Sequence, residues 1–178
     1  MRKFVIAAAL SFIGGAVFAQ DVKVDFDKSA DFTALKTFSV KLGTSWNNEI
    51  SEKRIMGEVA ETLTEKGWKQ VDANPDALVV VHGATQTKRS LNTFYSGGYG
   101  GYGYRGWGAG GMGSATTTES EYQVGTLVVD IFNAQSKQLV FRGAAQDEIS
   151  DKAEKNAKKL AKVSDKMFKD FPPGSKKK

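Results

Sequence analysis

The sequence predicts an α+β fold, with a largely antiparallel sheet of about five to six strands and two helices packed on one face. Strand-like segments open the chain, a helical segment follows, and further strands precede a final helix. The first strand is predicted because Val22, Val24 and Phe26 alternate with charged residues. The helices are predicted because apolar residues recur at spacings of three and four over 48–66 and 150–171.

Local signals place the other elements. Gly67 is positioned to end the first helix in a left-handed conformation. The run from Leu78 to Val81 is apolar at every position, which favours a central strand. The best-defined hairpin joins two apolar strands through a turn at 133–137. The strands after the first are predicted at 37–40, 68–71, 77–89, 120–132 and 138–147.

Residues 1–19 resemble a cleavable secretory signal peptide. Arg2 and Lys3 precede an uncharged, largely apolar run at 4–18, and Ala19 favours cleavage before Gln20. The run is shorter than the roughly 20 apolar residues of a membrane span, and no second such run follows. An uncleaved anchor is the alternative. The mature chain is therefore expected to be periplasmic, peripheral on a membrane at most, with one domain over 20–171 and a basic tail at 172–178.

The chain contains no cysteine. This excludes disulfides, thiolate metal sites, thiol nucleophiles and lipid attachment through an N-terminal cysteine. No metal and no cofactor are expected. The formal charge of +5 includes Arg2 and Lys3, so the mature chain carries only a modest basic excess, mostly near its C-terminus.

Taken in order along the mature chain, several segments resemble one known family. Their order and spacing resemble the bacterial envelope family called domain of unknown function 4136. That family has no established activity or catalytic residues, and the resemblance implies only an envelope location. Many members look like lipoproteins with a cysteine at the mature N-terminus, whereas this chain has Gln20 there. The segments that carry the resemblance are 22–26, 31–38, 65–68, 76–80, 125–130, 138–143 and 171–172.

Three polar residues within apolar strands are candidates for a pocket. His82 is the only histidine, so a two-histidine metal site is excluded and a structural role is favoured over a catalytic one. Asp130 and Arg142 flank a turn, and one register places them opposite each other, as an ion pair or as the polar floor of a ligand groove. Acid/base pairs could also form among four carboxylates, but their spacing selects no two of them. They are Asp25, Asp27, Asp130 and Asp147.

Residues 94–113 are rich in glycine and aromatic residues. Glycine supports no core, so a mobile loop between two strands is the simpler interpretation. The alternative is that its rings stack on sugars, membrane headgroups or another copy of the chain. Two Gly-x-Gly-x-x-Gly matches lack the strand and helix of a dinucleotide site, and export argues against nucleic acid as a partner. The candidate interaction residues are Tyr99, Tyr102, Tyr104 and Trp107.

The last helix carries a row of lysines opposite its apolar side. A solvated helix face is the simpler interpretation, and contact with anionic lipid or polysaccharide is the functional one. The row comprises Lys155, Lys159, Lys162, Lys166 and Lys169.

These features support three hypotheses. The first is a non-enzymatic, envelope-associated binding module that uses the 94–113 segment, the lysine row or both to contact lipid, polysaccharide or another protein. The second is a small-ligand carrier with a pocket between sheet and helices around His82, Asp130 and Arg142. The third is a hydrolase that uses paired carboxylates. The sequence leaves the oligomeric state open.

Overall fold

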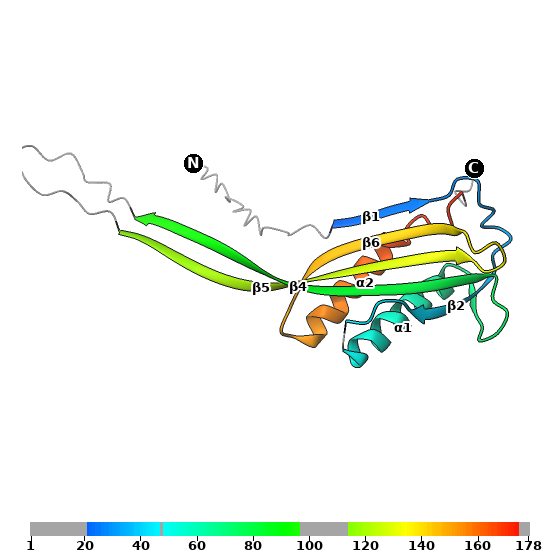
Figure 1. Cartoon of the computed structure of the whole chain (residues 1–178), viewed down its shortest axis with the longest axis horizontal. Coiled ribbons are helices and arrows are strands. Elements are labelled where there is room, and N and C mark those ends of the chain that lie inside the picture. Colours follow the sequence, from blue (N-terminus) through cyan, green and yellow to red (C-terminus); the bar gives the residue numbers. More distant parts are fainter. Residues whose placement is uncertain (1–20, 47, 97–113, 175–178) are drawn as a thin grey trace, which may run out of the picture.

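Six strands form one open sheet, and two helices cover one of its faces (Figure 1). The computed structural model describes residues 21–46, 48–96 and 114–174. The strand order is β1-β6-β5-β4-β2-β3. In chain order the elements are β1 (Asp21–Phe26), β2 (Thr37–Leu42), α1 (Glu49–Glu65), β3 (Lys69–Gln70), β4 (Ala77–Ser96), β5 (Ser114–Asn133), β6 (Leu139–Ile149) and α2 (Ala153–Met167).

The sheet is mixed, which corrects the expectation of a largely antiparallel one. β1, β6, β5 and β4 pair antiparallel, whereas β2 runs parallel to both β3 and β4. The reason is α1, which crosses the sheet face between β2 and β3 and returns the chain in the direction of β2. Parallel neighbours require such a crossover, and a helix is its usual form.

The ends of α1 agree with the range predicted from the sequence. Asn48 begins α1, with its side chain accepting a hydrogen bond from the Ser51 N–H at 3.0 Å. Gly67 ends it with φ +91°, the left-handed conformation that glycine adopts without strain. α2 is shorter than predicted and ends at Met167, although Phe168 and Phe171 beyond it remain buried.

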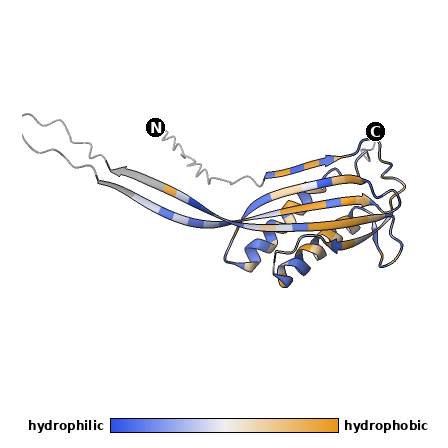
Figure 2. Ribbon diagram, in the orientation of Figure 1, coloured by the Kyte–Doolittle hydropathy of each residue, from blue (hydrophilic) through white to orange (hydrophobic). Residues whose placement is uncertain are grey.

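The core lies between the sheet and the helices. Alternate residues of the central strands, such as Val81 and Val129, meet Leu63 of α1 and Met167 of α2 there. Six aromatic rings close the end of the core that holds the two helix C-termini. Their centroids lie 4.9–6.3 Å apart in the pairs Phe32–Phe171, Phe38–Trp68, Trp68–Phe171, Phe141–Phe168, Phe141–Phe171 and Phe168–Phe171. Figure 2 shows the apolar residues concentrated in this part of the molecule.

β4 and β5 extend well past the other elements. Their register is unbroken from Ala77↔Asn133 to Ser96↔Ser114. The pairing of β2 with β4 ends at Val81, and that of β6 with β5 ends at Gln123. Residues 88–96 and 114–122 therefore project as a two-stranded ribbon, which we call the arm (Figure 1).

The two strands of the arm are longer than the sequence predicted. The strands were expected to end at 89 and to resume at 120, and 94–96 were assigned to the loop. Instead, residues 90–96 belong to β4 and residues 114–119 belong to β5. The signal was missed because residues 88–91 and 117–122 are mostly polar, with Leu91 and Tyr122 as exceptions, and show no apolar alternation.

Asp76 ties the parallel part of the sheet together. Its Oδ2 accepts hydrogen bonds from the N–H groups of Lys36 and Thr37 at 3.0 and 2.8 Å and from the Thr37 hydroxyl at 2.8 Å. These bonds lower the pKa of Asp76, the Thr37 hydroxyl most strongly. The carboxylate holds the start of β2 beside the start of β4.

We predict that Asp76→Asn lowers the free energy of unfolding by about 1 kcal/mol at pH 7, because a half-buried carboxylate is partly screened by solvent. The folded carboxyl has the lower pKa, so the unfolded chain binds the proton more tightly. The contribution is therefore complete above about pH 4 and is lost as the pH falls further.

The measurement is denaturant unfolding of both proteins between pH 3 and pH 7, with the exposed Asp72→Asn as control. The difference in the free energy of unfolding between wild type and Asp76→Asn is expected to become smaller at acidic pH. A difference that stays constant over this range would contradict the assignment.

Candidate functional site

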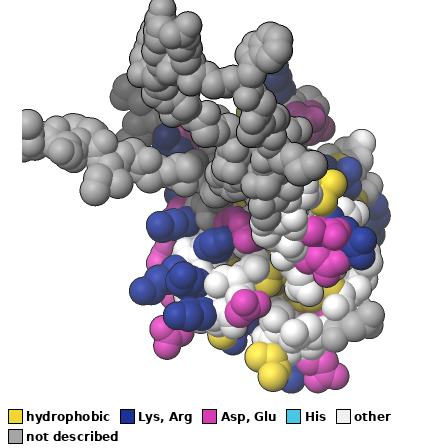
Figure 3. Space-filling model, turned by 90° about the vertical axis from the view of Figure 1, so that its left-hand side faces the viewer, with side chains coloured by type: hydrophobic (Ala, Val, Ile, Leu, Met, Phe, Trp, Pro, Cys, Tyr) yellow, Lys and Arg dark blue, Asp and Glu magenta, His cyan; other side chains and the backbone are white. Residues whose placement is uncertain are grey.

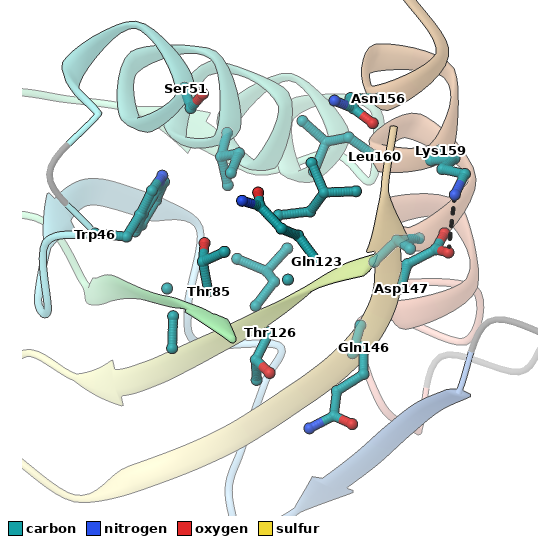
Figure 4. A pocket seen from close by; sticks show the side chains of 18 of the residues that line it. Trp46, Ser51, Thr85, Gln123, Thr126, Gln146, Asp147, Asn156, Lys159 and Leu160 are labelled. Carbon is teal, nitrogen blue, oxygen red and sulfur yellow. Dashed lines mark hydrogen bonds and ion pairs between the residues drawn. The ribbon is translucent and has the colours of Figure 1, made fainter. Parts of the chain in front are cut away.

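A groove of about 510 Å³ lies between the sheet and the helices, next to the base of the arm (Figure 4). It forms because both helices begin near the middle of the long strands and leave the adjoining part of β4 and β5 uncovered. Its lining comes from the loop before α1, the N-terminal turns of both helices, the middle of β4 and β5, and the C-terminal end of β6.

Trp46 forms one wall of the groove. Its six-membered ring packs against Gly83 of β4 so closely that a Cβ at that position would collide with it. The loop that carries the ring is held by the buried Glu52, whose Oε1 accepts from the Ser45 hydroxyl at 2.6 Å and the Trp46 N–H at 3.1 Å. The indole is thus fixed in position before any ligand arrives.

The floor of the groove is aliphatic. Leu127 of β5 and Ala145 of β6 contribute from the sheet, and Ile55 of α1 with Leu160 and Val163 of α2 contribute from the helices. An apolar floor of this kind favours the burial of a hydrocarbon or ring surface.

Uncharged polar groups surround that floor. Figure 4 shows the amide of Gln123 and the hydroxyl of Thr85 pointing toward the space beside Trp46. Ser51 of α1 stands at the rim, and the Asn156 amide closes the α2 side through two bonds to the Ser150 backbone, of 2.8 and 2.7 Å. Amides and hydroxyls can bond to hydroxyl, carbonyl or amide groups of a ligand.

Two of the charged residues that line the groove, Lys159 and Asp147, form an ion pair. Lys159 Nζ lies 3.2 Å from Asp147 Oδ1 and donates to the carbonyl of Glu148 at 2.6 Å. Lys159 is therefore not simply part of a solvated row of lysines. It links α2 to β6. In the described residues, no three His, Asp or Glu side chains gather as a metal site would require.

His82, Asp130 and Arg142 do come together, but on the opposite face of the sheet. They alternate with the core residues of their strands, and β5 and β6 pair in the register Asp130↔Arg142 that the sequence suggested. Asp130 is almost fully buried, and Arg142 binds it with two hydrogen bonds of 2.6 Å. The three residues are absent from the lining of the groove.

His82 completes this group as a structural residue. Its Nδ1 accepts a hydrogen bond from the Thr44 N–H at 3.1 Å, which assigns the ring proton to Nε2. Nε2 faces Asp130 Oδ2 at 3.7 Å. The Asp130 carboxylate also raises the pKa of Arg142, through its hydrogen bond first and its charge second. The arrangement is a satisfied ion pair.

The four carboxylates considered for acid/base chemistry are separated. Asp25 stands across from Arg142 in the β1–β6 register, with Arg142 between it and Asp130. Asp27 binds the hydroxyl and N–H of Ser29 in a turn. Asp147 is on the groove side with Lys159. Each carboxylate has its own partners, and the register brings no two of them together.

The remaining lysines of the row are exposed. Lys155, Lys162 and Lys166 lie on α2, whereas Lys169 follows the helix. The neighbouring helix α1 carries acidic residues, among them Glu58 and Glu61. Burial, and then the charges of Glu61 and Asp165, raise the pKa of Glu58.

The end of the molecule from which the arm projects carries many charged side chains (Figure 3). In Figure 3, Lys and Arg side chains gather on one side of this end, next to acidic ones. The aromatic candidates Tyr99, Tyr102, Tyr104 and Trp107 lie outside the described residues.

The sequence suggested a pocket between the sheet and the helices, but not the residues that line it. Trp46, Gln123 and Asn156 carry no motif, and they meet only because three separate elements approach the same stretch of β5. The one usable signal was a tryptophan two residues before a helix N-cap, a place where a large ring without a core position is unusual.

A family model described as Domain of unknown function (DUF4136) matches residues 22–173. The chain belongs to this family. The match covers the described domain from β1 to the segment after α2, which confirms the resemblance inferred from the sequence. No curated protein matches this family member.

Solved structures resemble this family member in fold alone. A PDZ domain protein from Parabacteroides distasonis has a TM-score of 0.51 and 17% identity, covering 86% of this chain and 36% of its own. The chain thus spans about a third of that protein.

Two further structures are more distant. PelC from Paraburkholderia phytofirmans, a dodecamer, gives a TM-score of 0.45 at 13% identity over 82% of this chain and 94% of its own. A putative neuraminyllactose-binding hemagglutinin homolog from Helicobacter pylori gives 0.42 at 10% identity over 79% and 87%.

We predict that Arg142→Met lowers the free energy of unfolding by about 2 kcal/mol, because it leaves the buried Asp130 charge without its partner, while solvent at the half-exposed Arg142 position reduces the cost. Asp130→Asn combined with Arg142→Met should recover part of that loss, since a neutral amide is less costly to bury. Urea unfolding of the three proteins measures the difference. A double variant less stable than Arg142→Met would contradict a buried ion pair.

Proposed function

We propose that this chain is an exported, non-enzymatic binding module of the bacterial cell envelope. Residues 1–19 would deliver it to the periplasm, where it acts as a soluble or membrane-peripheral protein. In the described residues, neither helix has the length and apolar character that a bilayer crossing requires. The proposed partner is an anionic lipid, a polysaccharide or another envelope protein.

The observation that carries this proposal is the arm. The arm ends at Ser96 and Ser114, the residues that flank the Gly- and Tyr-rich segment in the chain. β4 and β5 carry these ends away from the helices and from the groove (Figure 1). Extending a polar ribbon of this length buries little apolar surface, so folding stability alone does not account for it. A role in contact with other molecules does.

Exposed lysines on α2 provide a second contact surface. Lys155, Lys162 and Lys166 keep their charge available, whereas Lys159 is bound to Asp147. Attraction between such lysines and an anionic lipid surface is worth about 1 kcal/mol per residue and weakens with salt.

We predict that replacing residues 97–113 with an Asn-Gly turn reduces association with isolated envelope fractions by roughly tenfold, equivalent to a loss of 1.4 kcal/mol. The ring-free variant Tyr99→Ser/Tyr102→Ser/Tyr104→Ser/Trp107→Ser should lose as much, because the rings supply the stacking surface. Co-sedimentation of the purified mature chain with envelope fractions measures both.

The matched control is Lys155→Gln/Lys162→Gln/Lys166→Gln. If the lysines contribute, this variant loses the salt-sensitive part of the association and keeps the rest. Association unchanged in all three variants would contradict the proposed module.

A second function, carriage of a small ligand, is favoured by the groove. An aliphatic floor, one aromatic wall, neutral amides and hydroxyls, and a charge that is internally paired suit an uncharged amphiphile. The carrier hypothesis thereby moves from His82, Asp130 and Arg142 to the groove beside Trp46.

We predict that the uncharged fluorescent dye N-phenyl-1-naphthylamine binds in this groove. Leu160→Trp should weaken binding by roughly tenfold because the larger side chain fills the space, and Trp46→Ala should weaken it by removing the wall. Fluorescence titration gives both affinities. Leu91→Trp on the arm is the control, and equal affinity in all variants would place the dye elsewhere.

A further inference from the structure

The arm has two backbone edges that no strand of the described chain covers. On β4 the neighbour β2 ends at the level of Val81, and one loop bond, from Gly83 N–H to Thr44 O at 3.3 Å, extends the cover slightly. On β5 the neighbour β6 ends at the level of Gln123. Past these points each strand pairs only with the other strand of the arm.

The hydrogen bonds at the base of the arm show which peptide groups face outward. Gly43 N–H donates to Val81 O at 2.8 Å, and Gly83 N–H donates to Thr44 O. Odd-numbered residues of β4 therefore direct their N–H and C=O away from β5. The register has no bulge, so this parity continues into the arm through Thr87, Arg89 and Leu91.

The same parity applies to β5. Residues directly opposite each other in an antiparallel pair share their bonding pattern. Since even-numbered residues of β4 bond to even-numbered residues of β5, the odd-numbered Glu119 and Glu121 direct their peptide groups outward. The arm thus offers one row of unpaired donors and acceptors on each edge, which is a template for a further strand.

The two edges carry opposite charges. β4 contributes Lys88 and Arg89, and β5 contributes Glu119 and Glu121. Within the arm, Arg89 Nε lies 2.8 Å from Glu121 Oε1 and Nη1 lies 3.6 Å from Glu119 Oε1, and all three side chains are more than half exposed. Both carboxylates and the guanidinium remain accessible to charges on a neighbouring strand.

Charge decides which edges can meet. Pairing two β4 edges brings basic residues together, and pairing two β5 edges brings acidic residues together, which is unfavourable in cross-strand positions. A β4 edge against a β5 edge places Arg89 of one chain near the glutamates of another. When two arms point the same way, this pairing is antiparallel, so it continues the pattern of the arm itself.

We propose that the arm is a self-association device in which the outer edge of β4 in one copy pairs with the outer edge of β5 in the next. The occupant of each edge is a second copy of this chain. An isolated two-stranded ribbon is marginally stable in water, and a third strand stabilises it. The contact is head-to-tail, so every copy added leaves one edge of each kind free until a ring closes.

This proposal goes beyond the proposed function, and its test uses purified mature chain with no envelope component. Sedimentation velocity over a concentration series measures self-association. Leu91→Pro removes an outward N–H and leaves the β4–β5 bonds in place, so it should weaken association by roughly tenfold. Leu91→Ser, which keeps the N–H, is the matched control and should associate like wild type.

Charge reversal tests the pairing of unlike edges. Lys88→Glu/Arg89→Glu should abolish association, because both edges are then acidic. The fully exchanged variant Lys88→Glu/Arg89→Glu/Glu119→Lys/Glu121→Lys should restore it, since the pairs within and between arms are re-formed. Association that survives the double variant, or is not restored by the exchange, overturns the proposal. Circular dichroism checks that each variant is folded.

Cross-linking identifies the edges directly, because the chain has no cysteine of its own. Thr87→Cys and Glu121→Cys, which stand opposite each other when Arg89 faces Glu119, are made as separate proteins and oxidised alone and mixed. Head-to-tail pairing predicts a disulfide dimer only in the mixture. Dimers of one protein alone would indicate like edges and overturn the proposal, as would a wild-type chain that remains monomeric at about 1 mM.

The proposal also requires that the arm, and not the Gly- and Tyr-rich segment, drives association. A chain with 97–113 replaced by an Asn-Gly turn should associate like wild type, and its loss of association would overturn the proposal. In this background Leu91→Pro should again reduce association.

Discussion

The unbroken pairing of β4 with β5 is the constraint on which the structure depends. Along their inner halves, alternate residues such as Val79, Val81 and Val129 face the helices and build the core. Along their outer halves the same ladder continues past the helices and projects as the arm (Figure 1). One register therefore determines both the position of the core and the direction of the projection.

The difference in length between strands and helices creates the groove. Both helices begin partway along the long strands, so the sheet extends beyond the helix layer. Trp46 covers part of the exposed sheet, and its close approach requires the missing side chain at Gly83. A larger residue at 83 would displace the ring and widen the groove, so one glycine couples the sheet to the wall of the candidate site.

The predicted and observed sites differ for a physical reason. His82, Asp130 and Arg142 were recognisable because charges within apolar strands must be paired, and the register confirms the Asp130–Arg142 pair. Nothing in the sequence indicated which face of the sheet the helices would cover. The ion pair lies on the uncovered face, and the groove is lined by residues such as Gln123 and Asn156 that have no local signal.

The sequence by itself determined the family, the helices and the inner strands, because apolar periodicity and caps such as Asn48 and Gly67 act locally. It did not determine the parallel pairing of β2, which depends on where the α1 crossover returns the chain. The length of the arm and the groove were likewise decided by tertiary structure. Polar strands leave no alternation to detect, and a groove exists only where separate elements end at the same level.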